Sequence, residues 1–101
     1  MIAIIDYGVG NLFSLSSSLS HIGLECLVTG DKEIISKADK IILPGVGAFE
    51  DARKLLSRDG LDEFLIDQAN GGKPFLGICL GMQLLFDKSF EYGEHVGLGL
   101  I

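Results

Sequence analysis

The sequence predicts an α/β fold, in which an open and mostly parallel β-sheet carries helices on both faces. Short aliphatic segments of strand length alternate along the chain with segments whose apolar residues recur at helical spacing. Glycine-rich loops also follow three of the predicted strands, as in sheets that bind ligands at one edge. A length of 101 residues with 48% hydrophobic content is enough for the core of one domain.

The first three elements are predicted by apolar patterning. Residues 1–5 form an almost continuous aliphatic run that ends at Asp6, which is typical of a strand buried on both faces. Residues 12–22 predict a helix, because leucine and isoleucine recur there at helical spacing and Asn11 is a suitable N-cap. Residues 24–29 alternate and are rich in apolar side chains, so they predict a second strand.

The middle of the chain predicts one more strand and up to three helices. Residues 31–38 predict a short helix or turn, and residues 41–43 predict a third buried strand that Pro44 ends. Two helical patterns follow at residues 49–58 and 61–70, separated by an Asp-Gly pair.

The last part of the chain predicts a strand followed directly by a helix. Residues 75–78 are the fourth strand, and residues 80–86 continue as a helix behind Cys79. Residues 87–96 are polar and predict a loop. The regular alternation implies right-handed crossovers and a flavodoxin-like arrangement of the sheet.

Three glycine-bearing loops are expected to meet at one edge of this sheet. They cover residues 6–11, 44–49 and 77–81, each directly after a predicted strand. Because parallel strands end at the same edge, the alternating order alone brings these loops together.

Composition excludes several classes of function. The net charge of −6 and the pI near 4.6 argue against a surface for nucleic acid or for an anionic membrane. No apolar run approaches the roughly 20 residues that span a bilayer, and the start of the chain does not resemble a signal peptide. We therefore expect a cytoplasmic protein whose two cysteines are free thiols.

Nucleotide and metal sites are not predicted either. Gly8-x-Gly10 lacks the third glycine of a dinucleotide fingerprint, since Phe13 stands there, and Gly45-x-Gly47 has Glu50 at the corresponding place. The histidines and cysteines are scattered, so no metal site is predicted, and no cofactor is expected.

Cys79 is the candidate nucleophile. It stands in the pattern Gly77-x-Cys79-x-Gly81, the cysteine form of a strand-to-helix elbow in which small neighbours permit a sharp turn. A thiol at the first turn of a helix also lies near the positive end of the helix dipole, which favours the thiolate. The alternative is a buried structural thiol, which is the interpretation we give to Cys26 inside the second strand.

Two further features are candidates for substrate contacts. Gln83 lies one helical turn after Cys79 and could contact a substrate, or it could simply be an exposed helix residue. Pro44-Gly-Val-Gly47 could be only a tight turn, or its backbone N–H groups could stabilise an oxyanion.

The sequence does not offer Cys79 a general base. His21 is predicted about 15 Å from the catalytic edge, since ten helical residues rise ~1.5 Å each. His95 falls in the polar segment near the end of the chain, where a solvated surface position is favoured.

Three segments resemble the glutamine amidotransferase subunits of imidazole glycerol phosphate synthase, and the similarity runs over all 101 residues. The elbow with its following glutamine is shared by class I, triad-type amidotransferases, whereas the loop after the third strand is specific to the histidine-pathway branch. The segments are Asp6-Tyr-Gly-Val-Gly-Asn11, Ile41-Ile-Leu-Pro-Gly-Val-Gly-Ala-Phe49 and Gly77-Ile-Cys-Leu-Gly-Met-Gln-Leu-Leu85.

The resemblance implies glutamine hydrolysis. Cys79 matches the family's nucleophile, and the backbone N–H of Leu80 together with the Val46–Gly47 strand matches the oxyanion hole. Gly47 and Gln83 match positions that contact glutamine. Ammonia then passes to a cyclase partner with a (β/α)8 barrel in a heterodimer, and Tyr7 and Asn11 are expected to face that partner.

The resemblance also implies that residues 1–101 are the N-terminal half of a single amidotransferase domain, because the family's catalytic His and Glu lie in the other half. This chain alone is then expected to be inactive. Two alternatives stay open at this point. One is an amidotransferase of another pathway, such as pyridoxal phosphate, anthranilate or surface-sugar synthesis. The other is a regulatory module with a degenerate triad.

Overall fold

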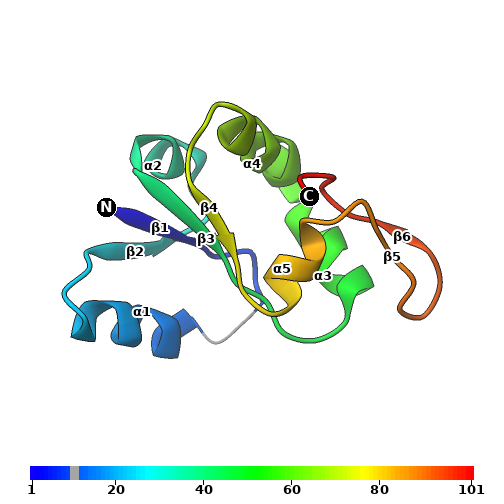
Figure 1. Ribbon diagram of the computed structural model, residues 1–101, viewed down its shortest axis with the longest axis horizontal. Coiled ribbons are helices and arrows are strands. Elements are labelled where there is room, and N and C mark those ends of the chain that lie inside the picture. Colours follow the sequence, from blue (N-terminus) through cyan, green and yellow to red (C-terminus); the bar gives the residue numbers. More distant parts are fainter. Residues whose placement is uncertain (10–11) are drawn as a thin grey trace.

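A four-stranded parallel sheet forms the centre of the molecule in the computed structural model, which describes residues 1–9 and 12–101 (Figure 1). The spatial order is β2-β1-β3-β4. β2 is therefore added on one side of β1, whereas β3 and β4 are added on the other side. This confirms the predicted fold class. The strands are β1 (Ile2–Ile5), β2 (Cys26–Thr29), β3 (Lys40–Leu43) and β4 (Phe75–Gly77).

The helices follow the predicted alternation. The segment after β2 is a helix rather than a turn, because the Asp31 carboxylate caps it by accepting the Glu33 backbone N–H at 2.9 Å. The N-cap predicted for the first helix, Asn11, lies outside the described residues. The helices are α1 (Leu12–His21), α2 (Lys32–Lys37), α3 (Phe49–Leu56), the 3-10 turn η1 (Arg58–Gly60), α4 (Leu61–Asn70) and α5 (Leu80–Leu84).

The main core lies on the sheet face that α2, α3, α4 and α5 cover. Side chains alternate across a strand, so the odd-numbered residues of β1 and β3 point to this face. They pack with apolar side chains from all four helices in one cluster. Among its largest fully buried members are Ile5, Ile35, Ile41, Leu43, Phe49, Leu56, Leu65 and Leu84.

Among the described residues, α1 is the one helix on the opposite sheet face, and Figure 1 shows it on the lower side of the sheet. No residue of α1 is fully buried. Ile4 and Ile42 are covered on this face, but Leu76 of β4 is 55% exposed. An apolar cavity of about 320 Å³ extends beside α1 along β3 and β4, lined among others by Leu19, Ile42 and Leu76. The part of this face formed by β4 is therefore open to solvent.

The predicted loop at residues 87–96 is wrong in part, because a short antiparallel hairpin forms there. Its strands are β5 (Lys88–Ser89) and β6 (His95–Val96). An ion pair between Lys88 and Glu94 at 2.8 Å joins the two arms. The Arg53 Nε donates to the Val96 carbonyl at 3.0 Å, which ties the hairpin to α3.

Within the described part of the chain, the helices are all too short to cross a lipid bilayer.

Candidate active site

The elbow between β4 and α5 has the geometry that its glycines predict. Cys79 adopts φ 54° and ψ −121°, a conformation that L-residues rarely take, and its side chain is exposed. A Cβ on Gly77 would lie 2.6 Å from the Met82 Cα, and one on Gly81 would lie 1.8 Å from the Leu43 carbonyl oxygen. Both positions therefore require glycine, and the backbone presents the Cys79 thiol to solvent.

The loop after β3 is packed directly on this elbow. Pro44 and Gly45 are buried, and the Gly45 carbonyl accepts the Leu80 backbone N–H at 3.1 Å. The Ile78 N–H donates to the Leu43 carbonyl at 3.0 Å, so the elbow is held on both sides. The predicted meeting of the second and third glycine loops at the carboxyl edge is confirmed.

The proposed oxyanion donors have different surroundings. The Leu80 N–H bonds to the Gly45 carbonyl in this structure, so it must exchange that partner before it can bind a substrate oxygen. Val46 is 59% exposed, and Gly47 adopts φ +101° with open space around it. The backbone of these two residues is thus accessible beside the elbow, and their role as oxyanion donors stays a prediction.

Gln83 also stays a prediction as a substrate contact. Its backbone N–H donates to the Cys79 carbonyl at 3.2 Å, as expected one helical turn later, and its side chain is exposed. The side chain lines a cavity of about 250 Å³ together with Phe86, Lys88 and Glu91.

The two histidines lie in different environments. His21 is exposed at the carboxyl end of α1. The solvated position favoured for His95 is wrong, because its side chain is only 20% exposed and stacks on Phe49 with ring centroids 6.4 Å apart. Its Nε2 lies 3.7 Å from Glu50. Across residues 1–9 and 12–101, no hydrogen bond or ion pair joins either histidine to Cys79.

Cys26 is half-buried rather than fully enclosed. Its Sγ contacts the Ser16 carbonyl at 3.7 Å, between β2 and α1. It is a free thiol like Cys79, so the expectation that the two are unpaired is confirmed. In the same described ranges, no three His, Cys, Asp or Glu side chains gather into a group that could hold a metal ion.

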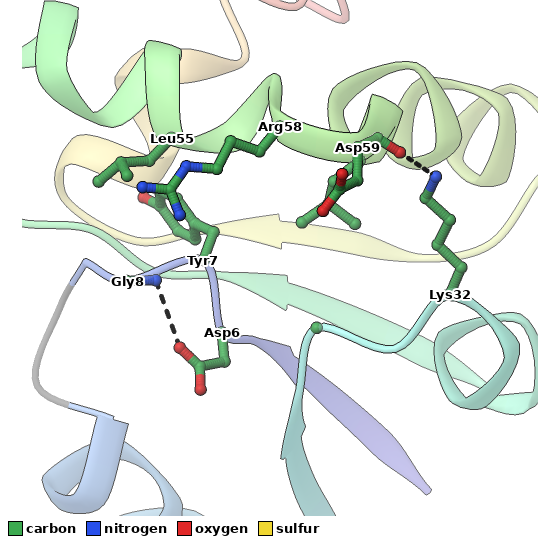
Figure 2. Close-up of a pocket in the computed structure, with 9 residues that line it drawn as sticks. Asp6, Tyr7, Gly8, Lys32, Leu55, Arg58 and Asp59 are labelled. Atoms are coloured by element: carbon green, nitrogen blue, oxygen red, sulfur yellow. Dashed lines mark hydrogen bonds between the residues drawn. The ribbon is translucent and has the colours of Figure 1, made fainter.

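A second hollow lies over the carboxyl ends of β1 and β2. It has a volume of about 480 Å³ and does not include Cys79. Figure 2 shows Tyr7 and Arg58 in its wall, with the Lys32 ammonium hydrogen-bonded to the Asp59 carbonyl on the opposite side. Tyr7 is 7% exposed, so any contact of this loop with a partner must come from its neighbours or its backbone. Asn11, the other predicted partner contact, lies outside the described residues.

The molecule is thus an α/β protein that carries an exposed thiol on a strained strand-to-helix elbow, at the carboxyl edge of a parallel sheet. Some enzymes of this fold class hold a nucleophile on such an elbow. The model of the class-I glutamine amidotransferase family matches residues 3–97. The chain belongs to that family.

Relatives of similar sequence support this assignment. The chain is 52% identical over 101 residues to the imidazole glycerol phosphate synthase subunit HisH of Bacillus licheniformis, covering 100% of this chain and 48% of the relative. It is 52% identical over 99 residues to the HisH subunit of Aquifex aeolicus, covering 97% of this chain and 48% of the relative. The chain thus spans about half the length of the curated relatives it matches.

The likeness to a solved structure concerns the fold. A crystal structure of a glutamine amidotransferase superposes with a TM-score of 0.82 at 22% identity, covering 100% of this chain and 53% of that one.

Proposed function

We propose that this chain is the cysteine-bearing, N-terminal half of the glutaminase subunit of imidazole glycerol phosphate synthase, an enzyme of histidine biosynthesis. The observation that carries the proposal is the exposed Cys79 thiol on its elbow, with the Pro44–Gly47 loop packed against it. The name shared by the 52% identical relatives supports this pathway over the pyridoxal phosphate, anthranilate and surface-sugar alternatives.

In the proposed reaction the Cys79 thiolate adds to the side-chain carboxamide carbon of L-glutamine. The nitrogen takes up a proton and leaves as ammonia, and a γ-glutamyl thioester remains on the sulfur. Water then adds to the thioester carbon, which restores the thiol and releases glutamate. The Leu80 N–H and the Val46–Gly47 backbone would stabilise the oxyanion, and Gly47 and Gln83 would hold the substrate.

The remaining parts of the proposal concern the second half of the domain and the partner. The general base would be a histidine, oriented by a glutamate, in the second half of the domain. The ammonia would pass to a cyclase partner with a (β/α)8 barrel in a cytoplasmic heterodimer, with the loop of residues 7–11 facing that partner. No cofactor is required for amide hydrolysis by this route.

A pair of cysteine variants tests the nucleophile. In the full-length subunit with its cyclase partner, Cys79→Ser should lower kcat for glutamine hydrolysis by at least about a thousandfold, because an alcohol replaces the thiolate. Cys26→Ser is the matched control and should retain activity. The measurement is ammonia release, with mass spectrometry of the acyl-enzyme. Equal loss in the two variants would contradict the assignment.

The half-domain proposal has a separate test. The 101-residue chain alone should show no glutamine turnover, with or without the cyclase, because it would lack the general base. Substantial turnover by this chain would show that the proposed division of the triad is wrong.

A further inference from the structure

The hydroxyl of Tyr7 anchors the loop that follows β3. It donates a buried hydrogen bond to the Pro44 carbonyl oxygen at 2.6 Å. Tyr7 follows β1 and Pro44 follows β3, so the bond joins the two central strands at the point where the strand order changes direction. Of the residues that the structure describes, only Tyr7 donates a hydrogen bond to this carbonyl.

Gly45 shows independently how closely Tyr7 packs on this loop. A Cβ on Gly45 would lie 2.6 Å from the Tyr7 Oη, 3.0 Å from the Gly81 nitrogen and 3.1 Å from the Leu80 Cβ. The Tyr7 hydroxyl and the cysteine elbow therefore both crowd the position that a side chain on Gly45 would occupy. A continuous path of contacts runs from Tyr7 through this loop to the residues that flank Cys79.

We propose that Tyr7 is a positioning residue for glutamine hydrolysis: its hydroxyl fixes the Pro44–Gly45 peptide and, through it, the Val46–Gly47 backbone beside Cys79. The inference rests on the proposed function and assigns Tyr7 an inward role in addition to any contact its loop makes with a partner. Burial raises the pKa of Tyr7 to about 12, so the phenol remains a hydrogen-bond donor at neutral pH.

Loss of the hydroxyl would affect the loop more than the fold. The buried Pro44 carbonyl would lose its donor, and an unsatisfied buried carbonyl is unfavourable. The hollow of about 480 Å³ beside Tyr7 leaves room for the ring to move once the bond is gone (Figure 2). The peptide can then turn, and Gly45 shifts relative to the elbow.

The kinetic test compares the two tyrosines of the chain. Tyr7→Phe in the full-length subunit with its partner should lower kcat about tenfold, with KM changed less than twofold, because transition-state geometry is disturbed more than substrate binding. Tyr92→Phe removes the same hydroxyl from a side chain that is 88% exposed, and should match the wild type. A Tyr7→Phe kcat within twofold of that of Tyr92→Phe would overturn the proposal.

Amide hydrogen exchange on the 101-residue chain gives a readout that does not need activity. The Leu80 N–H, bonded to Gly45 at 3.1 Å, should exchange at least about tenfold faster in Tyr7→Phe. The Ile41 N–H, bonded to the Pro74 carbonyl at 2.9 Å at the far end of the sheet, should be unchanged. Equal acceleration at both amides would indicate general destabilisation and would contradict the positioning role.

These readouts separate the two proposals and allow for a variant that does not fold. If the wild type hydrolyses no glutamine, the proposed function fails, while Leu80 exchange still decides the role of Tyr7. If Tyr7→Phe does not fold, Gly45→Ala displaces the loop from the intact hydroxyl and from the elbow together, because a Cβ there would meet both. It should reproduce the loss of kcat and the faster Leu80 exchange, and wild-type values for both would overturn the proposal.

Discussion

Cys79 and its glycines illustrate how single residues fix the site. A residue with a side chain at φ 54° and ψ −121° is strained, and such strain persists only where the surroundings impose it. At Cys79 the strained conformation is imposed by two close backbone contacts, one between Gly77 and Met82 and one between Gly81 and the end of β3. The two glycines are needed because neighbouring backbone atoms leave no room for a Cβ at either position. Their spacing around Cys79 therefore allowed the elbow to be predicted from the sequence.

The buried phenol of Tyr7 predicts a loss of stability at alkaline pH. Burial raises its pKa from 10.0 to about 12, so between these values the folded chain holds a proton that the unfolded chain has released. Stability therefore falls as pH rises through this window, by roughly 2 to 3 kcal/mol at most. Urea unfolding at a series of pH values measures this loss of unfolding free energy. Tyr7→Phe should remove this contribution and Tyr92→Phe should not, and equal pH dependence in both variants would refute the assignment.

At the scale of elements, an ion pair joins α3 to α4. The Arg53 guanidinium lies 2.8 Å from the Asp62 carboxylate, with side chains only 23% and 13% exposed, and Arg53 also bonds to β6. Asp62→Asn removes one charge and leaves the other poorly solvated, so it should cost about 2 kcal/mol of unfolding free energy.

The exposed pair on the same helix is the matched control for that variant. Lys54 and Glu50 lie 3.1 Å apart with side chains 73% and 44% exposed, so Lys54→Gln should cost less than about 0.5 kcal/mol. Urea midpoints at constant m-value give both numbers. Similar losses of unfolding free energy in the two variants would show that burial does not make the Arg53–Asp62 pair more stabilising than the exposed pair.

The elements that could be predicted from sequence are those with strong local patterns. The four strands lie in or within one residue of their predicted ranges, because buried parallel strands are continuous aliphatic runs. The hairpin was missed because β5 and β6 have two residues each and are mostly polar. His95 was misplaced because its burial depends on Phe49, which is distant in sequence and contributes no local signal.

The candidate site could be predicted in part for the same reason. Cys79 and the loop after β3 follow from strand ends, which the sequence marks with glycine and proline. The inward orientation of Tyr7 was not predicted, although a signal exists: Ala3, Ile5 and Tyr7 are alternate residues and share the core face. The hydrogen bond between the Leu80 N–H and the Gly45 carbonyl has no sequence signal, since every residue except proline has the same backbone groups.

At the scale of the whole molecule, the two sheet faces differ in how well they are covered. In the part of the chain that the structure describes, one face packs against four helices and the other against α1 alone. On the second face Leu76 of β4 is 55% exposed beside an apolar cavity of about 320 Å³. A sheet in this fold class is normally covered on both faces. Exposed apolar surface of this kind favours association in water.

We therefore predict that the isolated 101-residue chain self-associates through this face at micromolar concentration. Leu76→Asp should weaken association by about tenfold or more, because burying a leucine contributes about 1.5 kcal/mol or more and each 1.4 kcal/mol is a factor of ten. Phe90→Asp is the control, since Phe90 is 75% exposed but follows β5, away from this face. Sedimentation velocity across a concentration series measures the effect, and a wild-type chain that stays monomeric throughout would contradict it.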